Sequence, residues 1–108
     1  MSVKPQFNEL IHSPVRLRIC ALLRPVGELE FSVIARTLEL SDAHLSKNLR
    51  SLAEAGIIEL RKAKAADGID ARRKSTWVKL TGSGQNAVEG HLAALAELAA
   101  GVLPEERA

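Results

Sequence analysis

The residues most suited to chemistry are cationic and lie in one short segment. Residues 61–79 contain seven Lys or Arg side chains against two Asp, a net charge of +5. Residues 1–60 are neutral, with seven cations and seven acids, and residues 80–108 carry −3, with one Arg against four Glu. Ammonium and guanidinium groups concentrated in this way are typical of a surface that binds phosphate. A solvated loop is the alternative, because charge runs are more often plain surface.

Enzyme chemistry has no matching group of residues. His12, His44 and His91 lie in three separate segments of the sequence, and Cys20 has no base beside it. The sequence has no Gly-rich phosphate loop and no paired-carboxylate motif, and the stretch 82–84, Gly-Ser-Gly, is predicted to be a loop. We therefore expect no catalytic residue, no cofactor and no enzyme activity.

Metal binding and redox chemistry are weak predictions as well. One cysteine cannot form a disulfide within the chain or a thiolate metal cluster. Glu89 and His91 are two residues apart on a predicted helix and so point about 200° apart. We expect no metal site, and an intersubunit site at His91 is the alternative. Cys20 lies between Ile19 and Ala21 in a helix with core neighbours, which predicts a buried, inert thiol rather than a redox switch.

Length and composition limit the fold class. The chain has 108 residues, of which 46% are hydrophobic and 3% aromatic, enough for one domain with its own core. Leu and Ala dominate the apolar residues, which favours helix. No apolar run approaches the roughly 18 residues of a membrane span, and residues 1–6 lack the apolar stretch of a secretory leader. We expect a single domain over residues 1–108, located in the cytoplasm and not in a membrane.

Apolar spacing predicts helices before the cationic segment. Ser13 and Pro14 begin one helix, as capping and first-turn residues, and residues 7–12 are predicted to form a short leading helix. After a brief extended piece, helical spacing returns twice, with a break and a new cap at Ser41. These two helices predict a helix-turn-helix over about residues 31–55.

The cationic segment is predicted to be a β-hairpin. Two runs with alternating apolar residues flank the turn dipeptide Asp67-Gly68. The hairpin over about residues 57–80 therefore has a long basic tip. An apolar stripe then predicts a C-terminal helix over about residues 83–102. The fold class is mainly α with a small β-hairpin.

This order places a polar helix beside a basic hairpin. The third helix buries Leu45, Leu49 and Leu52, and its outward face is small, polar and cationic. Such a helix fits the major groove of DNA, while the hairpin reaches phosphates or the adjoining minor groove. An ordinary solvent-exposed helix is the alternative, and the neighbouring hairpin argues against it.

Five segments resemble the winged-helix regulators of the MarR and ArsR type, especially their short stand-alone branch. The resemblance covers about residues 7–100, and its strength lies in the order and spacing of the segments. It implies a winged helix-turn-helix with N- and C-terminal dimerisation helices, in a bacterial or archaeal transcriptional regulator. It also implies a homodimer on a roughly palindromic operator. The segments are PVRLRI at 14–19, SDAHLSKNLR at 41–50, LAEAGII at 52–58, RRKSTW at 72–77 and LT at 80–81.

By this resemblance, two sets of residues contact double-stranded DNA. On the third helix, Ala43, His44 and Lys47 face base edges, where Lys47 can donate to guanine and Ala43 can touch a thymine methyl group. Ser46 and Arg50 of the same helix hold phosphates. The hairpin, or wing, neutralises phosphates and gives affinity that depends strongly on salt. Its predicted contacts are Lys62, Lys64, Arg72, Arg73 and Lys74.

The last helix is predicted to pair two copies of the chain. Its apolar stripe exceeds what the core needs, and several alanines beside the stripe permit close approach of another helix. A lid on the domain's own core is the alternative. The predicted interface residues are Leu92, Leu95, Leu98 and Val102.

Two other functions stay open. A winged helix can serve as a protein–protein interaction module, with the third helix packed on a partner instead of DNA. An RNA-binding winged helix is less favoured, because exposed aromatics are missing and Trp77 is expected to pack beside the hairpin. The resemblance also implies a possible small-molecule effector, but no converging polar groups mark a pocket for one.

Overall fold

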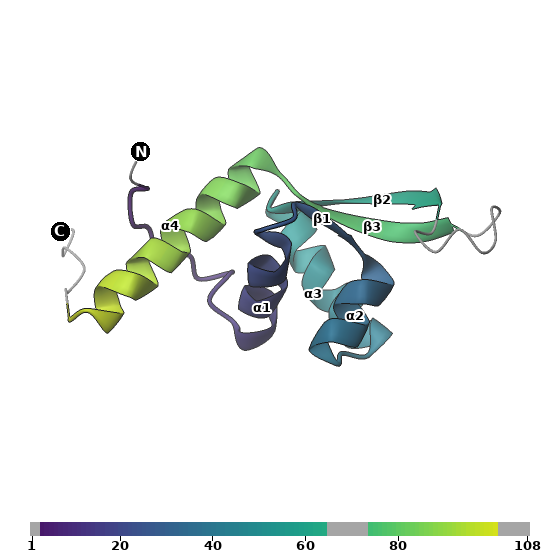
Figure 1. Ribbon diagram of the computed structural model, residues 1–108, viewed down its shortest axis with the longest axis horizontal. Helices are drawn as coiled ribbons and strands as arrows, with labels where there is room; N and C mark the ends of the chain where they lie inside the picture. The colour runs from purple at the N-terminus through teal and green to yellow at the C-terminus, as the bar shows by residue number, and fades with distance from the viewer. Residues whose placement is uncertain (1–2, 65–73, 102–108) are drawn as a thin grey trace.

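A computed structural model of the chain describes residues 3–64 and 74–101 (Figure 1). Its described elements are helices and one antiparallel sheet. In chain order they are α1 (Pro14–Leu23), β1 (Glu28–Glu30), α2 (Phe31–Leu38), α3 (Asp42–Glu54), β2 (Ile58–Lys64), β3 (Lys74–Leu80) and α4 (Gly82–Ala99).

The arrangement is a winged helix, mainly helical with a small hairpin, as predicted. Strand β3 lies between β1 and β2 and is antiparallel to both, and β1 forms at the predicted extended piece. Figure 1 shows α1, α2 and α3 together on one side of the sheet, with β2 and β3 extending away from them. Helix α4 runs off in the opposite direction. Within residues 3–64 and 74–101, no helix is both long and apolar enough to cross a bilayer.

The leading helix predicted over residues 7–12 is wrong, because this segment forms a turn. The His12 N–H donates to the Asn8 carbonyl at 2.9 Å, and the Asn8 side-chain oxygen accepts the Ile11 N–H at 2.9 Å. Asn side chains that bond nearby amides compete with helix continuation. Ser13 then caps a new helix, α1, so the turn and the helix remain separate. We call residues 3–13 the N-terminal segment.

The stretch Gly82–Gly84 was predicted as a loop, and it is instead the first turn of α4. The Thr81 hydroxyl caps this turn: it accepts the Gly84 N–H at 2.8 Å and donates to the Gly56 carbonyl at 2.6 Å. A Cβ on Gly84 would lie 1.9 Å from the Ile57 carbonyl oxygen. Only glycine permits this approach, so the start of α4 packs directly on the backbone that leads into β2.

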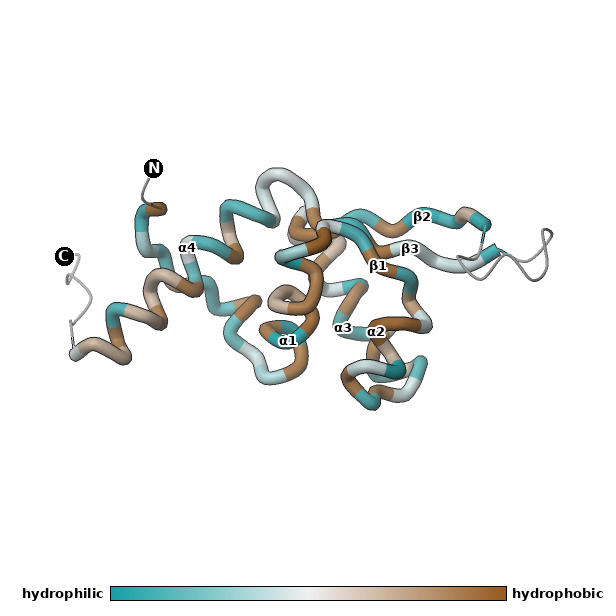
Figure 2. The backbone as a smooth tube through the Cα atoms, in the orientation of Figure 1, coloured by the Kyte–Doolittle hydropathy of each residue, from teal (hydrophilic) through white to brown (hydrophobic). Residues whose placement is uncertain are grey.

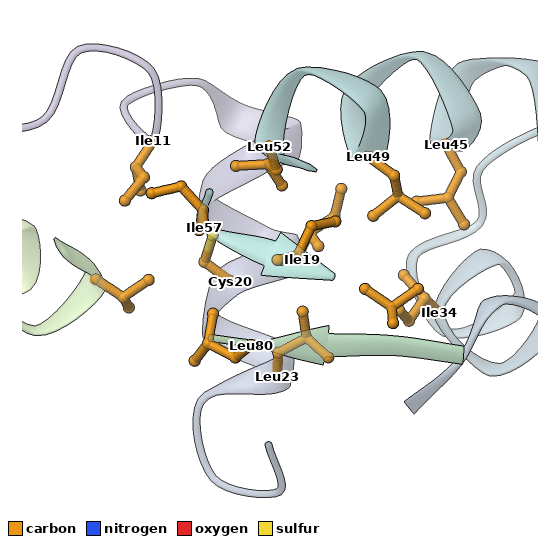
Figure 3. Packing of buried hydrophobic residues seen from close by; sticks show 13 residues of the cluster. Ile11, Ile19, Cys20, Leu23, Ile34, Leu45, Leu49, Leu52, Ile57 and Leu80 are labelled. Atoms are coloured by element: carbon orange, nitrogen blue, oxygen red, sulfur yellow. The ribbon is translucent and has the colours of Figure 1, made fainter. Parts of the chain in front are cut away.

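The hydrophobic core lies between the helices and the sheet (Figure 3). Cys20 is fully buried in it, as predicted, and burial raises the pKa of its thiol to about 11. A thiol with such a pKa carries little thiolate near neutral pH. The core residues are Ile11, Ile19, Cys20, Leu23, Ile34, Leu45, Leu49, Leu52, Ile57, Ile58, Val78, Leu80 and Val88.

Candidate nucleic-acid interface

Helix α3 presents its polar residues to solvent. The Ser41 hydroxyl begins the helix by accepting the His44 N–H at 3.1 Å. Leu45, Leu49 and Leu52 are buried at helical spacing, which turns the opposite face outward. Of the predicted DNA contacts on this helix, Ala43, His44, Lys47 and Arg50 are exposed and Ser46 is half-buried.

Asn48 is a position that the sequence analysis missed. Its side chain is 6% exposed; its oxygen accepts Arg16 Nη1–H at 2.9 Å and its amide donates to the His44 carbonyl at 2.9 Å. Arg16 Nε also donates to the Leu10 carbonyl at 2.6 Å. A buried amide that is bonded at both ends fixes the position of its helix. The available signal was its spacing of three residues from Leu45, on the buried stripe.

Three predicted wing lysines are exposed on the hairpin. Lys62 and Lys64 belong to β2 and Lys74 to β3, and Lys64 lies directly opposite Lys74 in the register. Like charges placed opposite each other destabilise a strand pair, and a bound anion relieves that repulsion. Arg72 and Arg73, the other two predicted wing contacts, lie outside the described residues.

The lysines of β2 stand on the sheet face that continues toward α3. Side chains alternate along a strand, so Leu60, Lys62 and Lys64 share one face. Leu60 and Thr76 line an open groove of about 310 Å³ together with Arg50 of α3. Lys62 Nζ donates to the Thr76 hydroxyl at 2.7 Å, which places this ammonium at the same groove. Cations of α3 and of the wing therefore border one surface.

Arg61 stands on the opposite face of the hairpin and has a structural role. Its guanidinium donates to both carboxylate oxygens of Glu28, at 2.8 and 2.9 Å, and lies 5.6 Å from the centre of the Trp77 ring. These bonds lower the pKa of Glu28 below its usual range. Trp77 donates from Nε1 to the Lys64 carbonyl at 3.1 Å and so packs on the hairpin, as expected. Arg61 thus anchors the hairpin to β1.

Helix α4 has two different halves. We call residues 82–91 its first half and residues 92–99 its second half. Val88 and His91 in the first half are fully buried, and Glu89 forms an ion pair with Arg24 at the end of α1, which lowers the pKa of Glu89. In Figure 2, most of the second half of α4, where the helix leaves the body, is coloured brown or tan for hydrophobic residues. Of the predicted interface residues, Leu92 packs partly on the core, Leu95 is half-buried, Leu98 is 44% exposed and Val102 lies outside the described residues.

Two histidines from separate segments meet beside this helix. His12 Nδ1 lies 3.3 Å from His91 Nε2, and the Phe7 ring centre lies 4.7 and 4.8 Å from the two imidazole ring centres. Burial and the neighbouring His12 lower the pKa of His91. Over residues 3–64 and 74–101, no group of three or more His, Cys, Asp or Glu is placed to hold a metal ion.

Known proteins share this architecture. A solved transcriptional regulator homologue from Pyrococcus horikoshii OT3 is 27% identical, with a TM-score of 0.78 over 88% of this chain and 89% of that one. YusO from Bacillus subtilis is 23% identical, with a TM-score of 0.69 over 88% of this chain and 63% of its own. An uncharacterized protein of Methanocaldococcus jannaschii, MJ0432, is 29% identical over 90 residues, which are 83% of this chain and 92% of that protein.

The family assignment rests on a match that spans most of the chain. The model of the winged helix DNA-binding domain matches residues 15–99, which include every helix and strand from α1 to α4 except the first residue of α1. The predicted resemblance to winged-helix regulators of the MarR type is confirmed. This family and fold are those of transcriptional regulators and not of enzymes. The chain belongs to the winged helix DNA-binding domain family.

Proposed function

We propose that the protein is a sequence-specific transcriptional regulator, acting as a repressor, that binds a palindromic operator as a homodimer. The observation that carries this proposal is the shared surface of α3 and the wing, where Arg50 and Lys62 border one groove. A double helix presents phosphates on both sides of its major groove, so a helix and a hairpin that face the same way can contact both.

The exposed face of α3 enters the major groove. Lys47 and Arg50 are exposed, and among the described residues their side chains have no ion-pair partner. Lys47 donates to guanine acceptors, His44 donates or accepts at a base edge, and Ala43 contacts a thymine methyl group. Ser46 and Arg50 hold the flanking phosphates and set the register of the helix.

The wing supplies affinity without sequence preference. Each ammonium that neutralises a phosphate releases counterions, which makes binding sensitive to salt. The lysines Lys62, Lys64 and Lys74 act in this way, and we include Arg72 and Arg73 of the cationic segment on the strength of the sequence.

Residues 1–108 form a single domain, and the second half of α4 joins two copies of this domain in the dimer. Leu95 and Leu98 leave apolar surface in solvent, and Leu92 and Val102 extend the same stripe in the sequence. A two-fold dimer sets two recognition helices about 34 Å apart, one turn of DNA, and so requires a palindromic site. A cytoplasmic location and an effector ligand stay predictions.

The direct test is selection of bound duplexes from a random pool by the purified protein. We expect a symmetric motif whose half-sites lie about 10 base pairs apart. The matched control is K47A/R50A, which removes two exposed side chains of α3 and should enrich no motif. Failure of the unmodified protein to enrich any sequence above that control would contradict the proposal.

A further inference from the structure

The N-terminal segment is bonded to the first half of α4. The Gln6 N–H donates to the Gly90 carbonyl at 2.9 Å, and the Asn8 N–H donates to His91 Nδ1 at 3.0 Å. The segment lies so close to the helix that a Cβ on Gly90 would be 3.3 Å from the Lys4 carbonyl oxygen. His91 is therefore buried between its own helix and this segment.

The bonds of His91 require both histidines to be neutral. A backbone N–H only donates, so His91 Nδ1 accepts from Asn8 and the ring proton sits on Nε2. That Nε2–H then donates to His12 Nδ1, 3.3 Å away. A second proton on His91 would face the Asn8 N–H, and a proton on His12 Nδ1 would face the His91 N–H. Protonation of either ring thus breaks one of the bonds between the segment and α4.

A chain of hydrogen bonds leads from this pair to α3, the recognition helix of the proposed function. The turn that holds Asn8 and His12 also contains Leu10, whose carbonyl accepts from Arg16 Nε at 2.6 Å. The same guanidinium donates to Asn48 Oδ1, and the Asn48 side-chain NH2 donates to the His44 carbonyl within α3. One arginine therefore holds the N-terminal turn and the recognition helix together.

We propose that Arg16 is a positioning residue for α3 and that the His12–His91 pair makes this positioning dependent on pH. At a pH where both rings are neutral, the turn is bound to α4 and Arg16 holds Asn48. Protonation of either ring releases the turn and loosens the Arg16 contact. The effect on DNA binding rests on the proposed function, whereas the release itself is a property of the free protein.

The surroundings of His91 favour this response to protons over metal binding. Among the described residues, the titratable groups that act on the pKa of His91 are His12 and Glu9, both in the N-terminal segment. Glu89 is two residues away on α4, about 200° around the helix, and is paired with Arg24. The His91 Nε2 that faces His12 carries a proton, so it cannot coordinate a metal unless the Asn8 bond is lost.

The first test measures amide hydrogen exchange in the free protein at about pH 8 and about pH 5, corrected for intrinsic exchange. The acid value is set low because burial lowers the pKa of His91. Every protein carries H44Q, so that His12 and His91 are the histidines compared. We expect the protection of the backbone amides of Asn8 and Asn48 to fall about tenfold in acid, the factor that one lost hydrogen bond can account for. The matched variant is H12N/H91N, because an Asn oxygen replaces Nδ1 as acceptor but does not titrate; its protection should not change with pH.

The second test measures affinity for the selected duplex at the same two pH values and one salt concentration. The H44Q protein should bind about tenfold more weakly in acid, the H12N/H91N variant should not, and R16M should bind weakly at both. Equal protection at both pH values, or the same acid loss in H12N/H91N, would overturn the proposal. If the unmodified protein, with His44 in place, binds no duplex at either pH, the proposed function fails, and the exchange data alone decide whether the pair releases the turn.

Discussion

Helices α3 and α4 each bury one face, but they expose opposite kinds of surface. Beyond its buried leucines, α3 leaves cationic and polar side chains in water, Lys47 and Arg50 among them. The second half of α4 leaves Leu98 44% exposed and Leu95 half-buried. An exposed cationic face suits a polyanion, and an exposed apolar stripe suits another protein surface. The same amphipathic principle thus predicts two different partners for two helices of one chain.

The anchoring of the two helices differs as well. A partly buried polar contact, Arg16 to Asn48, holds α3 on α1. The start of α4 is held by close backbone packing of Gly84 on Ile57. Loss of the first changes the position of a helix, whereas loss of the second disrupts the junction between α4 and the sheet.

The largest effect is expected from G84A. Its Cβ would lie 1.9 Å from the Ile57 carbonyl oxygen, a backbone atom that cannot move aside without displacing the strand. We expect a loss of at least about 3 kcal/mol in the free energy of unfolding, measured by urea titration. The matched control is G82A, two residues earlier, where nothing lies within 4 Å of the new Cβ. Equal stability of the two variants would show that α4 is not held by this contact.

The exposed stripe of α4 should control assembly. We expect L95E/L98E to be monomeric by sedimentation at micromolar concentration and to bind a palindromic duplex at least about a hundredfold more weakly, because bivalent binding is lost. The charge-matched control is N86E, an exposed position in the first half of the same helix. A monomeric unmodified protein, or a dimer that survives both leucine changes, would assign the stripe another role.

The exposed face of α3 should control recognition. We expect K47A to weaken binding of the selected duplex by about 10- to 100-fold and to relax the preference at one base pair. The control is K79A, which removes an exposed lysine from the opposite face of β3. Competition against single-base variants of the duplex measures both effects. If K79A were as damaging as K47A, base recognition would not reside on α3.

The smallest expected effect is a gain. Glu54 lines the same groove as Arg50 and is an acid that the sequence analysis did not take into account. We expect E54Q to raise the affinity for any duplex about two- to threefold at low salt by removing repulsion of phosphate. Unchanged affinity at low salt would place Glu54, and with it the end of α3, away from the DNA backbone.

The sequence was sufficient for elements that depend on local spacing. Helix α3 follows from leucines at helical spacing and a Ser41 cap, and the hairpin follows from alternation around a turn dipeptide. Contacts between distant segments have no such signal. His12 and His91 meet only because residues 3–13 lie along α4. Position 84 requires glycine because the Ile57 carbonyl lies so close to it. Local spacing therefore predicted a helix over residues 7–12 where the chain forms a turn. The prediction of a loop over residues 82–84, made from a missing motif, was also wrong.

The central claim is that α3 and the wing form one surface for DNA, and the salt dependence of binding tests it most directly. The logarithm of the association constant is measured against the logarithm of salt concentration for the unmodified protein, K62A/K64A/K74A and K79A. Each lysine that contacts phosphate contributes about 0.9 to the slope. The triple variant removes three such lysines from each subunit of the dimer, so it should flatten the slope by about 5.4 while K79A leaves it unchanged. An identical slope for the triple variant and the unmodified protein would contradict the claim.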